Sequence, residues 1–358
     1  MKPSLYGLKN SNRDFSDKDS WGKNQFNSSF PTALLCYMYS KEIKPVYITL
    51  KSNLNIKHEE LGAEELFNIN LSSNDVFFSF ETAHTKYSKY YIGTFPSNDL
   101  TILNKTNGNI VSSFEIKLTA LPDNETCTLS ENEFGTELVI RPNTIIYQVA
   151  MIIDCIKRES LLKIYDQKYD SLSESDWENE KKILNFVNQM ILDFNELIKN
   201  NVKKQRPFII QPIWKTNGKS STLSDNCLDV FIWSTFSISK LFVPNKNIEI
   251  KSINKISRKI RTLIWITKMI IDYLKSEKFN GEDIINKLSY RTKNDKAFSA
   301  NGKNTHPFMK SEILLNPRIH KNEIKNIILG GGENLLSPER RFDAIIFNSP
   351  NLFEKGDE

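Results

Sequence analysis

A stretch between residues 95 and 124 constrains the fold more than any other part of the chain. The apolar run Leu100–Leu103 reads as a strand, and Asn107 and Gly108 follow it closely. An Asn-Gly pair readily takes the positive φ angles of a tight hairpin turn. The run Asn109–Leu118 then returns with polar and apolar residues in alternation. We therefore predict an antiparallel β-hairpin here.

Three ionisable residues lie on this hairpin. Asp99 opens the first strand, and Glu115 and Lys117 lie two residues apart in the second. Side chains alternate between the faces of a strand, so Glu115 and Lys117 share one face while Ile116 points into the core. Because the hairpin folds back on itself, Asp99 comes beside Glu115. We expect two carboxylates and one ammonium group to meet on one face of a sheet.

This cluster suits the hydrolysis of a phosphodiester. Two carboxylates can hold Mg²⁺, which keeps several waters and also takes a phosphate oxygen. The metal makes a bound water more acidic and stabilises charge in the transition state. Lys117 can orient or deprotonate that water and offset charge on the phosphate. A Glu-x-Lys pattern is also common on amphipathic strands without activity, so a purely structural strand is the alternative interpretation.

Asp99, a hairpin and then Glu115-x-Lys117 together resemble the PD-(D/E)xK nuclease family. The Pro-Asp pair of that family is only loosely kept, because Pro96 lies three residues before Asp99. Pro122–Asp123 spells the pair literally, but it follows the lysine, and we interpret it as a turn. The resemblance therefore depends on the order and spacing of the three charged residues.

Longer segments extend the resemblance over most of the chain. The strings SFEIKLTALPDN, MKPSLYGLKNSNRDFSDKDSWGKNQFNSSFP and QPIWKTNG are similar to type II restriction endonucleases of the HindVP group. This resemblance implies Mg²⁺ bound by Asp99, Glu115 and the carbonyl of Ile116, with Lys117 positioning the water. It implies 5′-phosphate and 3′-hydroxyl ends in double-stranded DNA, cut at a degenerate palindrome of the GRCGYC type. It also implies a homodimer and a cognate DNA methyltransferase as genetic partner.

The predicted fold is α/β, with a mixed central sheet flanked by helices, a restriction-endonuclease-like core and basic DNA-reading insertions. We expect a single domain over residues 1–358, with a catalytic core at 45–240 and a basic helical and loop region at 241–358 for DNA recognition or dimerisation. Strands are expected at 45–50, 76–80, 137–140, 208–214, 228–233 and 342–347, and helices at 31–39, 57–67, 143–167, 177–203 and 251–279. Pro212 predicts an edge strand or a bend.

The composition fits a cytoplasmic protein. No apolar run approaches the roughly 20 residues of a membrane span, since Lys268 interrupts the most apolar helical stretch. The opening residues lack the apolar segment of a secretory signal. The four cysteines are scattered and form no CxxC pair, which suits a reducing compartment and argues against a zinc site.

The charge is unevenly distributed. Residues 1–200 carry 21 Lys and Arg against 27 Asp and Glu, whereas residues 201–358 carry 27 against 16. A basic C-terminal part suits a protein that binds the phosphate backbone of DNA. The alternative is a generally lysine-rich proteome. Within two polar, loop-forming segments, at 215–222 and 290–310, the candidate DNA contacts are Lys215, Asn217, Lys219, Arg291, Lys293, Asn294 and Lys303.

Several alternatives stay open at this point. The candidate DNA-reading segments can equally be solvated, lysine-rich loops. Glu60 or Glu64, from the helix expected at 57–67, can join the metal or lie on a solvated acidic face. A repair or structure-specific nuclease of the same fold would carry the same three charged residues. A DNA-binding protein without catalysis would use the Glu-x-Lys strand for structure alone.

Overall fold

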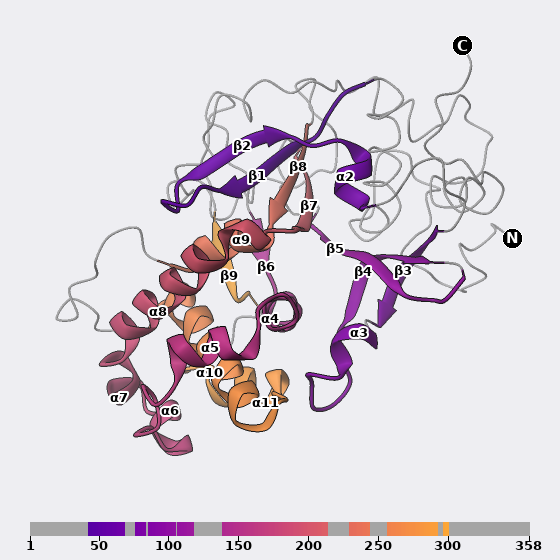
Figure 1. Cartoon of the computed structure of the whole chain (residues 1–358). Helices are drawn as coiled ribbons and strands as arrows, with labels where there is room; N and C mark the ends of the chain where they lie inside the picture. Colours follow the sequence, from indigo (N-terminus) through magenta and orange to yellow (C-terminus); the bar gives the residue numbers. More distant parts are fainter. Residues whose placement is uncertain are drawn as a thin grey trace, which may run out of the picture.

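The computed structural model describes residues 42–68, 76–83, 85–104, 106–117, 138–213, 229–243, 256–292 and 296–300 (Figure 1). Its strands are β1 (Val46–Leu50), β2 (Ile56–Glu60), β3 (Val76–Ala83), β4 (Ser97–Asn104), β5 (Ile110–Ile116), β6 (Leu138–Ile140), β7 (Pro207–Ile213), β8 (Asp229–Ser234) and β9 (Phe298–Ala300). Its helices are α2 (Ala63–Phe67), α3 (Thr85–Ser88), α4 (Pro142–Cys155), α5 (Arg158–Tyr165), α6 (Glu174–Glu178), α7 (Glu180–Leu184), α8 (Val187–Asn201), α9 (Thr235–Lys240), α10 (Arg258–Ser276), α11 (Gly281–Lys287) and the 3₁₀ helix η2 (Val202–Lys204). The helix expected at 31–39 and the strand expected at 342–347 lie outside these ranges.

Seven strands form one mixed sheet in the order β2-β1-β8-β7-β5-β4-β3. Two neighbouring pairs are parallel, β1 with β8 and β5 with β7, and the other four pairs are antiparallel. Strands β6 and β9 form a separate antiparallel pair. The sheet with its flanking helices confirms the predicted α/β class.

The hairpin of β4 and β5 forms where the Asn-Gly signal places it. Leu100 pairs with Phe114 and Thr101 with Ser113, and the register shifts between Ile102 and Leu103. The turn uses the left-handed conformation at Gly108, with φ of +67°, where a residue without a Cβ is free of steric cost. This hairpin reaches the middle of the sheet because β5 also pairs with β7.

The middle of the sheet is apolar on both faces. Phe208, Ile209 and Ile210 of β7 are buried, as are the residues Val230–Trp233 of β8. Pro212 was expected to mark an edge strand or a bend, but β7 lies between β8 and β5, so the edge position is wrong. On β7, the residues that pair with β5 end at Ile210. Pro212 lies beyond that pairing, so its missing N–H interrupts no hydrogen bond between β7 and β5.

Helices cover one face of the sheet in two layers, as Figure 1 shows. In the first layer, α9 contacts β1, β7 and β8, and α4 contacts α9. Tyr147 of α4 stacks on Phe208 of β7 with ring centroids 5.2 Å apart. Helix α10 lies in the second layer and contacts α4, α5, α8 and α11. On β5, Phe114 makes an edge contact with Phe67 of α2, with ring centroids 5.8 Å apart.

Two of the expected helices differ from the structure: one span begins as a strand, and the other contains a break. The segment 57–67 contains β2 followed by the short helix α2, because residues 56–60 pair with β1 along the edge of the sheet. The helix expected at 143–167 breaks after Cys155 into α4 and α5. Ile156 takes an extended conformation there and is buried. Its burial redirects the chain without a Gly or Pro to signal the break.

The helix expected at 177–203 is three helices, α6, α7 and α8. Ser173 and Asp176 form a capping box at the start of α6, so the first helix begins before the expected start at residue 177. The side chain of Asn179 accepts hydrogen bonds from the amides of Lys181 and Lys182 and so begins α7. Asparagine competes with helical hydrogen bonding in this way, and the apolar periodicity concealed it.

Helix α10 is shorter than the expected span of 251–279 and is largely buried. Arg261 and Lys268 are only 2% and 5% exposed, so these two cations lie inside the chain rather than on a DNA-facing surface. Arg261 donates a hydrogen bond of 2.8 Å to the carbonyl of Lys296, and Lys268 binds the carboxylates of Glu174 and Asp272 at 2.8 and 2.6 Å. In the part of the chain that the structure describes, no helix is both long and apolar enough to cross a membrane.

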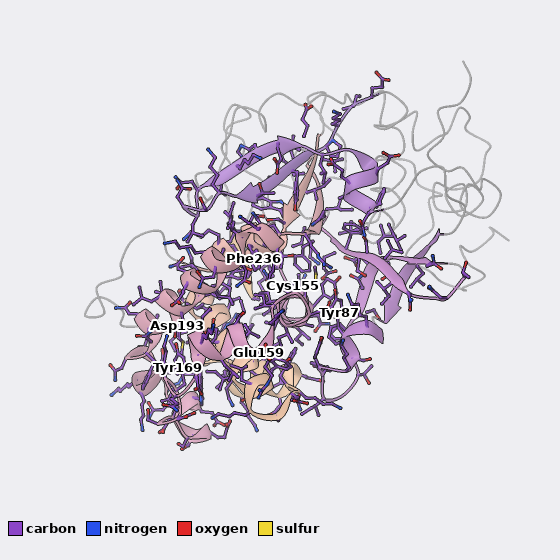
Figure 2. The ribbon with its side chains drawn as sticks, viewed as in Figure 1. Tyr87, Cys155, Glu159, Tyr169, Asp193 and Phe236 are labelled. Atoms are coloured by element: carbon purple, nitrogen blue, oxygen red, sulfur yellow. The ribbon has the colours of Figure 1, made fainter. Side chains whose placement is uncertain are left out.

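A buried carboxylate connects residues of the outer helical region. Asp193 of α8 is 1% exposed and accepts hydrogen bonds from Lys168, Tyr169 and Gln189 at 2.7, 2.7 and 2.8 Å. Figure 2 shows Tyr169 and Asp193 side by side at the end of the molecule away from the β4–β5 hairpin. Three donors on one buried carboxylate satisfy it fully, so this cluster has a structural role.

Gly281, the first residue of α11, packs directly on α4. A Cβ at this position would lie 2.6 Å from Cγ1 of Ile146 and 3.2 Å from a ring carbon of Tyr91. We predict that Gly281→Ala lowers the free energy of unfolding by about 1–3 kcal/mol, as overpacking does. Urea denaturation measures the change. Combining it with Ile146→Ala, which removes both Cγ1 and Cδ1, should cost less than the sum of the two single changes. A variant Gly281→Ala as stable as the unchanged protein would contradict this packing.

Candidate active site

The hairpin brings its three charged residues to one place. Asp99 lies on β4 and Glu115 on β5, one step beyond the pair formed by Leu100 and Phe114. Lys117 directly follows β5, and its amide donates a hydrogen bond of 2.9 Å to the carbonyl of Ile210. Ile116 between them is buried in the core, as the alternation of the strand predicts. The charged side chains therefore share the face of β5 opposite to Phe114 and Ile116.

Hydrogen bonds connect the three residues. The amide of Ile116 donates to Oδ2 of Asp99 at 2.6 Å, and Nζ of Lys117 donates to Oε1 of Glu115 at 3.2 Å. The side chain of Glu115 is only 9% exposed and that of Lys117 14%. The cluster is therefore largely desolvated, but the lysine keeps access to the surface.

The electrostatics indicate that the two carboxyl groups share one proton. Burial and the negative charge of Glu115 raise the pKa of Asp99 well above its usual value. Burial also opposes ionisation of Glu115, but Lys117 and hydrogen bonds from Asp99 and Thr144 outweigh it and lower the pKa of Glu115. Burial disfavours the charged form of Lys117, yet Glu115 and Asp99 raise its pKa. The neutral form of Asp99 and the ionised form of Glu115 are therefore the forms that the surroundings favour, beside the ammonium group of Lys117.

Helix α4 covers the cluster with its first turn, next to the hairpin (Figure 1). Oγ1 of Thr144 donates a hydrogen bond of 2.8 Å to Oε1 of Glu115. The sequence did not single out Thr144, and this contact was not predicted. The two residues are 29 positions apart in the chain, and only the packing of α4 on β5 brings them together. One signal was available in the sequence: Thr144 is a polar residue in the first turn of a helix that was expected to flank the sheet.

The donor set fits a magnesium ion. Mg²⁺ is usually held by one or two carboxylates with waters and substrate phosphate, rather than by a full set of protein ligands. Asp99 and Glu115 supply two carboxylates, and the second negative charge that burial disfavours is the charge that a cation would stabilise. Over the described ranges, no group of three or more His, Cys, Asp or Glu side chains could hold a metal. A metal here would therefore depend on water and phosphate for its remaining ligands.

Neither of the two earlier glutamates lies in this cluster. Glu60 lies on β2 at an edge of the sheet, and three strands, β1, β8 and β7, separate β2 from β5. Glu64 is exposed on α2, and α2 contacts the face of β5 that carries Phe114 rather than the face that carries Glu115. The structure therefore places neither Glu60 nor Glu64 beside the carboxyl groups of Asp99 and Glu115.

Comparisons with known proteins identify the family. The family model of the HindVP restriction endonuclease matches residues 21–353. The chain belongs to this family. A relative from Haemophilus influenzae described as probable type II restriction enzyme HindVP is 44% identical over 355 residues, covering 99% of this chain and 96% of that protein. Type II restriction enzyme HgiDI from Herpetosiphon aurantiacus is 42% identical over 361 residues, covering 99% and 98%. No solved structure is significantly similar to the chain.

Membership of the HindVP restriction endonuclease family confirms the resemblance found in the sequence. It also confirms the prediction that the chain is a type II restriction endonuclease. The individual roles of Asp99, Glu115, Ile116 and Lys117 remain predictions. Their geometry is what the predicted hairpin requires.

Of the seven candidate DNA contacts, the structure describes one. Arg291 is exposed on a turn in which Thr292 bonds back to Ser289 at 3.1 Å. Both Tyr290 and Arg291 have positive φ, and the hydroxyl of Tyr290 donates to the carbonyl of Trp177 at 2.6 Å. Part of the segment expected to be a loop, 298–300, is strand β9. The other six candidates lie outside the described residues: Lys215, Asn217, Lys219, Lys293, Asn294 and Lys303.

The raised pKa of Asp99 leads to a test of stability without metal. Because the folded-state pKa is above the unfolded value, ionisation destabilises the fold as pH rises from about 4 through the folded pKa. We expect Asp99→Asn, measured in EDTA, to raise Tm at neutral pH, with a gain that disappears near pH 4.

The matched control has the opposite sign. Hydrogen bonds from Lys182 and Ser173 lower the pKa of Asp176 to about 2. Asp176→Asn should therefore lower Tm at neutral pH, and its effect should fade as pH falls toward 2. Thermal melts of both variants between pH 2 and 8 provide the measurement. A Tm of Asp99→Asn below that of the unchanged protein at neutral pH would contradict the shared-proton description.

Proposed function

We propose that the chain is a Mg²⁺-dependent type II restriction endonuclease whose active site is Asp99, Glu115 and Lys117. The observation that supports this most directly is the meeting of two carboxyl groups, one buried and one half-buried, and one lysine on the β4–β5 hairpin. Family membership supplies the class of reaction, and the relatives' printed names describe type II restriction enzymes. The proposal assigns that reaction to particular residues of this chain.

In the proposed mechanism the carboxylates of Asp99 and Glu115 and the carbonyl of Ile116 hold the metal. Mg²⁺ bound there supplies a more acidic water and stabilises negative charge on the scissile phosphate. Lys117 releases its hydrogen bond to Glu115 and donates instead to the attacking water, which it orients toward phosphorus. Its positive charge also offsets charge that develops on the phosphate oxygens. As the oxygen of the water bonds to phosphorus, the bond from phosphorus to the 3′ oxygen breaks. The water loses a proton to solvent and the 3′ oxygen takes one up from solvent, which leaves a 5′-phosphate and a 3′-hydroxyl.

The proposed substrate is double-stranded DNA with a short palindrome. The sequence resemblance suggests the degenerate site GRCGYC, in which R is a purine and Y a pyrimidine. A palindrome has two-fold symmetry, so the enzyme would act as a homodimer with one active site for each strand. It would act in the cytoplasm, with a methyltransferase of the same specificity protecting the host DNA.

Variants of the cluster test the catalytic assignment. Asp99→Ala and Lys117→Ala should bind cognate DNA close to normally yet cleave it at least about 100-fold more slowly in Mg²⁺, the scale of a lost acid–base group. Single-turnover cleavage and gel-shift binding measure the two properties separately. Lys199→Ala, at an exposed lysine of α8, is the control and should cleave normally. Wild-type cleavage by either cluster variant would show that the residues are wrongly assigned.

Digestion of plasmid DNA tests the substrate. With Mg²⁺ we expect discrete bands whose ends carry 5′-phosphates and whose sequences share GRCGYC, and with EDTA we expect no cleavage. Sequencing the ends gives both the site and the cut position. A smear, or a preference for branched DNA, would instead indicate a structure-specific nuclease, and a different common sequence would overturn the specificity while leaving the mechanism intact.

A further inference from the structure

We propose that Thr144 is a positioning residue for the reaction, acting through the carboxylate of Glu115. The proposal rests on the proposed function, because it concerns how one of the proposed metal ligands is held. Thr144 is 1% exposed, and its hydroxyl lies 2.8 Å from Oε1 of Glu115. A buried hydroxyl directed at a buried carboxylate fixes the orientation of that carboxylate.

The contact distinguishes the two oxygens of Glu115. Thr144 and Lys117 both donate to Oε1, at 2.8 and 3.2 Å. Two donors on Oε1 leave Oε2 as the oxygen with which Glu115 would bind a metal ion. The hydrogen bond from Thr144 is the shorter of the two. Unlike Lys117, Thr144 does not contact the attacking water in the proposed mechanism.

The role of Thr144 follows from what Lys117 must do. The ammonium group of Lys117 has to turn from Glu115 to the attacking water and the phosphate during the reaction. When it does so, Oε1 would lose a donor in a largely water-free site, and an unpaired buried carboxylate oxygen is costly. The hydroxyl of Thr144 stays on Oε1 throughout, so the carboxylate keeps its orientation while the lysine moves.

The backbone around Thr144 is fixed on several sides. The carbonyl of Ile140, just before α4, accepts a hydrogen bond of 2.9 Å from the amide of Ala297. Pro142 at the start of α4 restricts φ where the helix begins. One turn later, Tyr147 stacks on Phe208 of β7, the strand next to β5. The hydroxyl is therefore presented by a rigid element, as a positioning role requires.

Two pairs of variants isolate the hydroxyl. Thr144→Val keeps the shape and removes the donor, while Thr144→Ser keeps the donor. If Thr144→Val folds poorly, comparing Thr144→Ser with Thr144→Ala tests the same hydroxyl without the methyl group. We expect the variants without a hydroxyl to cleave about 10- to 100-fold more slowly, the range found for groups that orient metal ligands, and Thr144→Ser to restore most of the rate.

The dependence on Mg²⁺ concentration separates positioning from folding. Variants without the hydroxyl should need more Mg²⁺ for half-maximal cleavage, whereas their binding of DNA in EDTA should be unchanged. Thr267→Val is the matched control, because Thr267 is also a fully buried helical threonine, but its hydroxyl has no hydrogen-bond partner among the residues that the structure describes. It should leave the Mg²⁺ dependence as it is.

The outcomes are distinguishable from failure of the proposed function. A normal rate and Mg²⁺ dependence in Thr144→Val, together with inactive Asp99→Ala, would overturn the role of Thr144 alone. Equal defects in Thr144→Ser and Thr144→Ala would also overturn it, because the hydroxyl would then be irrelevant. Active Asp99→Ala would overturn the proposed function itself.

Discussion

The structure depends on the burial of opposite charges at the centre of its sheet. Asp99, Glu115 and Lys117 would be unfavourable singly, because a buried ion without a partner is strongly destabilising. Together they partner one another, with the amide of Ile116 and the hydroxyl of Thr144 as further donors, and burial favours the neutral form of Asp99. Such an arrangement is balanced without a metal and leaves a carboxyl group that a cation can convert to a second carboxylate.

The sequence was sufficient for this part of the molecule because the interactions are local. Asn107 and Gly108 determine the turn, and the period of two residues along β5 places Glu115 and Lys117 on one face. The whole path from Asp99 to Lys117 spans 19 residues. Long-range packing contributes little to such a hairpin, so propensity and alternation predict it well.

Elsewhere the decisive contacts are distant in sequence. Apolar periodicity predicted one helix over 177–203, but the side-chain cap at Asn179 starts a new helix inside that span. Pro212 suggested an edge strand. An interior strand can contain this proline because the pairing between β5 and β7 is short and ends before it. The contact of Thr144 with Glu115 depends on how α4 packs, which the pattern of a single helix does not contain. Local signals were thus reliable where they were strong, as in the hairpin, but they missed β2 and β9 and were weak for helix boundaries and for the support of the site.

The position of β5 has a consequence for how the enzyme would lose activity. Its last residues pair with β7 in the interior of the sheet, and the amide of Lys117 is bonded to Ile210. Amides in such central strands exchange with solvent mainly through global unfolding, whereas peripheral helices open more easily. The proposed catalytic carboxylate of Glu115 is thus attached to a well-protected part of the backbone. Heat inactivation should accordingly follow cooperative melting of the sheet, even when outer helices such as α7 have already frayed.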